Sequence, residues 1–116
     1  MVGRWHPRWG IVFVRGRSME PTFAGFRRFP IVAWGRAPRI GDVVIAERPD
    51  RPGMRVVKRA TGHDAAGWWL ESDAHEKAPR GGAGIVFSDS WLFGPVPDAA
   101  ILGVVVWPDV RPRPRP

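Results

Sequence analysis

The apolar residues of this chain fall in short runs, each bounded by glycine, proline or aspartate. The runs are rich in β-branched residues and too short for typical helices, a pattern that predicts strands. Because no helical segments separate them, we expect an antiparallel arrangement. The fold class that follows is mainly β, with antiparallel sheets forming a partial barrel. The expected strands are 10–14, 31–34, 42–47, 54–60, 67–71 and 101–107.

The segments between these strands carry turn chemistry. Residues 48–53 read Arg-Pro-Asp-Arg-Pro-Gly, which predicts a tight turn, and residues 61–67 predict a hairpin-like loop. Residues 18–25 are suited to one short helical turn. The polar, glycine-rich residues 73–84 are expected to be flexible. We expect a single domain over 1–110, followed by a disordered Arg-Pro tail over 111–116.

Composition excludes several classes of function. The 116 residues include no cysteine, which rules out disulfides, thiol nucleophiles and cysteine-ligated zinc. No apolar run approaches the ~20 residues of a membrane-spanning helix, and the amino terminus lacks a signal-peptide core. We therefore expect a cytoplasmic protein with no membrane anchor. The formal net charge of +7, from sixteen arginines and two lysines against 11 acidic residues, requires an anionic partner to be considered.

One of the two lysines, Lys58, lies inside the expected strand 54–60. Alternation places it on one face with Val56 and Ala60. Such a lysine either extends its stem to solvent or is buried, and burial lowers the pKa of its ammonium group. A neutral lysine within reach of Ser18, which follows a strand and a glycine turn, would be a general base for that hydroxyl. The residues alone leave both interpretations open.

Four segments resemble the signal-peptidase family of serine–lysine proteases in their order and spacing. They are Gly-x-Ser-Met-x-Pro-Thr at 16–22, Gly-Asp-Val-Val at 41–44, Val-Lys-Arg at 57–59, and Ser-Asp-Ser-Trp-Leu-Phe-Gly-Pro-Val-Pro at 88–97. Ile-Leu-Gly follows at 101–103, so the resemblance extends over nearly the whole chain. It implies a signal-peptidase-like catalytic fold and serine endopeptidase activity without a metal or organic cofactor.

The resemblance also implies roles for individual residues. Ser18 would be the nucleophile and Lys58 the general base, with the Ser18 N–H as one donor to the oxyanion. Gly16 stands where some members carry a serine that supplies the second donor. Ser88 is the candidate for a hydroxyl that hydrogen-bonds the lysine.

Supporting roles follow from the same resemblance. Arg59 and Asp89 would form an ion pair that orients the lysine strand, and Met19 and Val56 would line a shallow substrate pocket. The substrate would be a protein or peptide, bound as an extended strand beside the serine turn and the lysine strand. Three positions depart from the family pattern, and they keep open an inactive relative that binds peptides without cleaving them. These positions are Phe26, Ala74 and Trp91.

Within the family, short members without an anchor resemble the maturation proteases of nickel-type superoxide dismutase. Those enzymes remove an amino-terminal extension from their substrate, and Gly67-Trp68-Trp69-Leu70 and the compact length suit that subgroup. We therefore predict a maturation protease that removes a leader or propeptide.

A basic β-barrel that binds nucleic acid is the alternative from a different class. Seven tryptophans and six phenylalanines would offer stacking platforms. The positive charges are, however, scattered among turns and the tail, and most tryptophans lie in or beside apolar runs, so we expect no stable nucleic-acid partner. His6, His63 and His75 occur in polar segments without metal-ligand spacing, and we expect no metal site.

Overall fold

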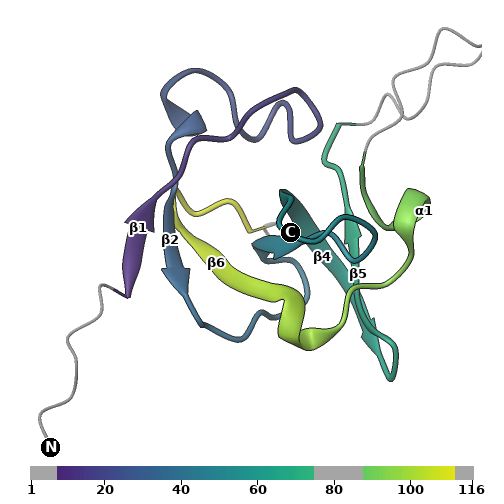
Figure 1. The fold of residues 1–116 in the computed structure, drawn as a ribbon. Helices are drawn as coiled ribbons and strands as arrows, with labels where there is room; N and C mark the ends of the chain where they lie inside the picture. Colours follow the sequence, from purple (N-terminus) through teal and green to yellow (C-terminus); the bar gives the residue numbers. More distant parts are fainter. Residues whose placement is uncertain (1–7, 75–87, 112–116) are drawn as a thin grey trace, which may run out of the picture.

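The computed structural model describes residues 8–74 and 88–111 (Figure 1). Within these ranges six strands form one antiparallel sheet in the order β1-β2-β6-β3-β4-β5. The predicted mainly β, antiparallel fold is confirmed, as a single open sheet whose edges are β1 and β5. The strands are β1 (Trp9–Ile11), β2 (Ile31–Trp34), β3 (Val43–Glu47), β4 (Arg55–Asp64), β5 (Gly67–Glu71) and β6 (Ile101–Trp107); the short helices are η1 (Gly25–Arg28), α1 (Ser90–Phe93) and η2 (Asp98–Ala100).

Strand β4 differs most from its prediction. It continues to Asp64 instead of ending at Ala60, so most of the predicted loop 61–67 is strand. A register shift between Ala60 and Gly62 lets the strand continue its pairing with β5. The remaining turn is tight, and the Asp64 carboxylate accepts a hydrogen bond from the Ala66 N–H at 2.8 Å. β2, β5 and β6 have the predicted bounds.

Apolar side chains are buried on both faces of the sheet. The central strand β3 shows this most clearly, since Val43 and Ile45 join one core cluster while Val44 and Ala46 join the other. The first cluster consists of Val14, Met19, Phe23, Val32, Val43, Ile45, Val105 and Val110. The second consists of Val44, Ala46, Ala60, Trp68, Leu70, Val96 and Val104.

The segment between β1 and β2 is anchored in the first cluster. Residues 18–22 form successive turns in place of the predicted single helical turn, and η1 follows at Gly25–Arg28. Met19 and Phe23, each 1% exposed, fix this segment to the sheet. In the described ranges, no helix has the length and apolar character needed to cross a membrane. Most of 73–84 and all of 112–116 lie outside the described residues.

Candidate functional site

Ser18 and Lys58, 40 positions apart in sequence, meet in the structure. The Lys58 Nζ donates a hydrogen bond to the Ser18 Oγ at 2.5 Å. Lys58 projects from β4 and is 4% exposed, whereas Ser18 is half-buried on the turn before η1. Of the two interpretations that the sequence left open for this lysine, the structure shows the buried one.

Burial changes the acid–base chemistry of Lys58. Desolvation lowers the pKa of its ammonium group to about 8 from an ordinary value of 10.5, against the opposing effect of the Asp89 and Asp73 carboxylates and with a smaller contribution from Arg48. With this pKa, roughly a tenth of the molecules carry a neutral Lys58 at pH 7. In those molecules the Ser18 hydroxyl is placed to donate its proton to Nζ, as general-base chemistry requires.

The turn that carries Ser18 is held by Arg28 of η1. Its guanidinium donates to the carbonyls of Val14 and Gly16, both at 2.8 Å, and to the Glu20 carboxylate at 2.9 Å. Gly16 has a φ of +77°, a left-handed conformation that favours glycine. Gly16 therefore shapes the turn. The role of Arg28 was not predictable from the sequence, because a long side chain that crosses a loop leaves no spacing signal.

Arg59, next to the lysine, forms its ion pair with Asp73. The guanidinium binds both carboxylate oxygens, with Nε–Oδ1 at 3.0 Å and Nη2–Oδ2 at 2.6 Å. The same carboxylate accepts a hydrogen bond from the Thr22 hydroxyl at 2.5 Å. Asp73 therefore joins the segment that carries Ser18 to the strand that carries Lys58.

The predicted pairing of Arg59 with Asp89 is wrong. Asp89 accepts instead from the N–H groups of Trp91 and Ser72, each at 3.0 Å. It directly precedes α1, where a carboxylate satisfies free helical N–H groups. Asp73 is the better placed partner because it follows β5, in which Glu71 pairs with Arg59.

The predicted hydrogen bond from Ser88 to the lysine is also not found. The Ser88 hydroxyl accepts from the Arg48 Nη1 at 3.0 Å. Continuing the β4–β5 register by one residue past Glu71 places Ser72 opposite Lys58. The Ser72 hydroxyl is buried and has no hydrogen-bond partner among the described residues, which is uncommon for a buried polar group. It is therefore the better candidate for a hydroxyl beside the lysine.

A cavity of about 370 Å³ opens beside the Ser18–Lys58 pair. Val56, one of the two predicted pocket residues, lines it. Met19, the other, does not, because it is packed into the first core cluster beneath the turn. The apolar lining comes mainly from the segment after β1 and from β2, β3 and β4, and most of it was not predicted. It consists of Val12, Phe13, Trp34, Ile45, Val56 and Val57.

The three positions that depart from the family pattern lie in different surroundings. Phe26 on η1 and Trp91 on α1 are both mostly exposed. The Ala74 N–H donates to the Ser18 carbonyl at 2.9 Å, a main-chain contact that other residue types also supply. None of the three departures removes a contact between Ser18 and Lys58.

The described residues contain no group of three or more histidine and acidic side chains placed to hold a metal ion. His63 lies in β4 and not in a loop, with its Nε2 2.8 Å from the Asp98 Oδ1 and its ring against Trp68. His6 and His75 lie outside the described residues.

Comparison with known proteins agrees with the motif resemblance at a coarse level. The chain is 29% identical to mitochondrial inner membrane protease subunit 1 of Xenopus tropicalis, over 84% of this chain and 69% of that protein. No family model matches the chain, and no solved structure matches it. The match supports a relationship to the signal-peptidase family and a peptidase-related role. The narrower resemblance to the maturation proteases of nickel-type superoxide dismutase stays a prediction.

Proposed function

We propose that this protein is a serine endopeptidase in which Ser18 is the nucleophile and Lys58 the general base. The observation that carries the proposal is the 2.5 Å contact between Ser18 Oγ and the buried Lys58 Nζ. A solvated lysine would be almost fully cationic at pH 7 and unable to accept a proton. Burial gives Lys58 the lowered pKa that a base working near neutral pH needs.

The reaction would proceed in two steps. Lys58 takes the Ser18 proton as the bond from Oγ to the scissile carbonyl carbon forms, and it passes that proton to the leaving amine as the carbon–nitrogen bond breaks. Lys58 then takes a proton from water as the water oxygen bonds to the acyl carbon, and it returns that proton to Ser18 Oγ as the bond from Oγ to the acyl carbon breaks, which releases the product acid. This chemistry needs no metal or organic cofactor.

The developing oxyanion needs hydrogen-bond donors. Within the described residues the Ser18 N–H donates to no protein acceptor, so it is available to the oxyanion. Gly16 has no side chain to act as a second donor, and we propose that water fills that role.

The substrate is proposed to bind as an extended strand along β4. Strand β4 pairs with β5 only from Arg59 onward, so no strand of the described residues covers the other edge of 55–58. The bond from Arg48 N to Met54 O fixes the alternation of the β3–β4 ladder. It follows that Val57 directs its N–H and C=O to the uncovered edge, where a peptide can pair with them.

The proposed role is removal of an amino-terminal leader or propeptide from a protein in the cytoplasm. The segment Gly67-Trp68-Trp69-Leu70 suits a maturation protease of the nickel-type superoxide dismutase kind. The relative from Xenopus tropicalis is a protease subunit by name, which supports proteolysis without indicating the substrate. Fractionation of cells that express the protein, followed by immunodetection, tests the proposed location.

The test of the activity is cleavage of fluorogenic peptides with small residues before the scissile bond. Ser18→Ala and Lys58→Met should each lower kcat/KM by about a thousandfold or more, because each removes one half of a cooperating pair. Lys77→Met, which changes the other lysine of the chain, is the control and should retain activity. Near-wild-type cleavage by Lys58→Met would refute the dyad. Peptide binding without any acyl-enzyme in mass spectra would indicate an inactive relative instead.

A further inference from the structure

The charged side chains among the described residues that line the cavity beside Ser18 are all basic. Besides Lys58, its charged lining residues are Arg15 and Arg55, and none of the described residues that line it is acidic. Both arginines are exposed, and neither has an ion pair or side-chain hydrogen bond to another described residue. By contrast, Arg28 on the nearby η1 is bound to Glu20 at 2.9 Å.

The two arginines reach the cavity from different elements. Arg15 precedes Ser18 by three residues on the nucleophile segment, and Arg55 precedes Lys58 by three residues on β4. A peptide paired with the uncovered edge of β4 would therefore run past Arg55 towards Ser18, with Arg15 at the cavity wall. Its side chains would meet apolar residues and fixed cations in the same cavity.

Two guanidinium groups without acidic partners define the chemistry of the ligand. A guanidinium binds a carboxylate through two parallel hydrogen bonds and keeps its charge at every physiological pH. Building on the peptidase function proposed above, we propose that the cavity beside Ser18 selects protein substrates with an acidic side chain close to the scissile bond. Arg15 and Arg55 would hold that acidic side chain. Apolar contacts with Phe13 and Trp34 would hold a neighbouring side chain.

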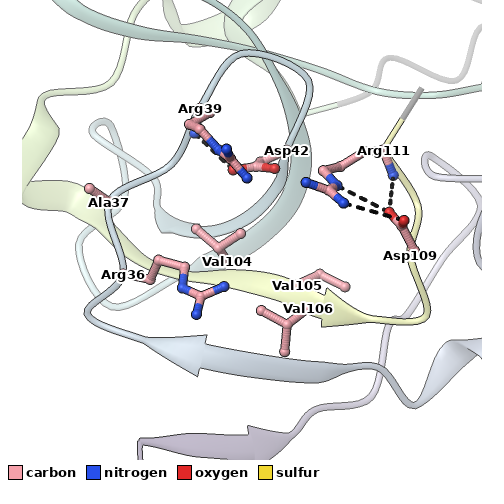
Figure 2. A pocket seen from close by; sticks show the side chains of 9 residues that line it. All are labelled: Arg36, Ala37, Arg39, Asp42, Val104, Val105, Val106, Asp109 and Arg111. Carbon is pink, nitrogen blue, oxygen red and sulfur yellow. Dashed lines mark hydrogen bonds and ion pairs between the residues drawn. The ribbon is translucent and has the colours of Figure 1, made fainter. Parts of the chain in front are cut away.

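A second cavity supplies a matched control. It has a volume of about 150 Å³, and Figure 2 shows Arg36, Arg39 and Arg111 around it together with Asp42 and Asp109. The hydrogen bonds and charge of Asp109, with a further contribution from Asp42, raise the pKa of Arg111. Arg36 lines this second cavity and not the cavity beside Ser18. Arg36→Gln therefore removes one arginine without changing the lining of the cavity beside Ser18.

The experiment compares peptides that differ at one position. A series carrying Glu, Gln or Lys is made at each of the four positions on either side of the scissile bond. At one or more positions we expect kcat/KM for Glu to exceed that for Gln by about fivefold to tenfold at low salt, with Lys lowest. The preference should appear mainly in KM and decrease at high salt.

Variants assign the preference to the two arginines. In Arg15→Gln/Arg55→Gln the ratio of Glu to Gln should fall to within twofold, whereas Arg36→Gln should keep the wild-type ratio. Cleavage of all three peptides within twofold at every position would overturn the proposal, and so would a preference that persists in the double variant.

Peptide binding to Ser18→Ala separates this proposal from the peptidase proposal. Tighter binding of the Glu peptide without cleavage by the wild type would refute the peptidase function and retain the charge selection. Cleavage by the wild type with no preference for Glu would refute the charge selection and retain the peptidase function. Equal binding of the Glu and Gln peptides to Ser18→Ala, together with no cleavage, would refute both.

Discussion

The two arginine-lined cavities of this protein differ in what faces the arginines. In the smaller cavity (Figure 2), Arg111 donates to both oxygens of Asp109, and the buried Asp42 lies in the same wall. In the larger cavity, none of the described lining residues is acidic, and the described residues form no ion pair with Arg15 or Arg55. The smaller cavity is partly neutralised by its own side chains, and the larger one leaves its positive charge to solvent or a ligand.

The comparison also separates lysine from arginine within the larger cavity. Burial lowers the pKa of Lys58 to about 8, so this side chain can lose its charge under mild conditions. Arg15 and Arg55 carry guanidinium groups, which in general serve as fixed cations in proteins. One cavity therefore combines a titratable base with fixed cations, which are suited to two different tasks, proton transfer and recognition.

The strongest test of this difference is the pH profile of cleavage. Since only neutral Lys58 accepts a proton, kcat/KM should rise by about fiftyfold between pH 6 and pH 8 and level off above a midpoint near the Lys58 pKa of about 8. In Asp89→Asn the midpoint should move to lower pH, because the Asp89 carboxylate raises the pKa of Lys58. A flat profile between pH 6 and 8 would exclude Lys58 as the base.

The second test compares two arginine–aspartate pairs. Asp73→Asn breaks the pair with Arg59, whose side chains are 12% and 14% exposed, and should cost about 2–4 kcal/mol of unfolding free energy. Because Asp73 also binds Thr22, kcat/KM should fall about tenfold. Asp109→Asn, at an exposed pair with Arg111, should change the unfolding free energy by less than about 1 kcal/mol. Urea titrations measure the unfolding free energy of both variants. Equal losses of unfolding free energy in Asp73→Asn and Asp109→Asn would contradict the distinction between the two pairs.

The smallest expected effect is a gain in stability. Lys58→Met should raise the unfolding free energy by about 1–3 kcal/mol at pH 6, because the folded state no longer holds a buried ammonium group. The folded-state pKa of about 8 lies below the ordinary 10.5, so the penalty is complete below pH 8 and decreases as the pH rises from 8 to 10.5. Thermal unfolding of the wild type and Lys58→Met at pH 6 and pH 10 measures the difference in stability where the penalty is complete and where most of it is lost. A loss of stability at pH 6 would show that the ammonium is well accommodated.

The sequence predicted those parts of the fold that depend on local patterns. The apolar runs of β2, β5 and β6 match the observed strands because these runs are short and bounded by turn residues or prolines. The extension of β4 beyond Ala60 was missed, since it depends on a bulge and on pairing with β5.

The candidate site was predictable where a motif carried it. Ser18 and Lys58 were identified from the motif segments, and the structure brings them together. The partner of Arg59 was not predictable, because it depends on where the chain goes after β5. Arg28 was missed for the same kind of reason, since it acts across a loop.

The burial of Met19 and Phe23, which both follow Ser18 in the same segment, has a consequence for how substrates are accepted. Swinging that turn outwards would expose two large apolar side chains to water, at a cost of about 1.5–3 kcal/mol for each. In the proposed peptidase, Ser18 Oγ would therefore be presented by a preorganised surface, and the incoming polypeptide would bear most of the conformational entropy cost of binding. We therefore expect the proposed peptidase to favour cleavage sites in segments that are unstructured before they bind.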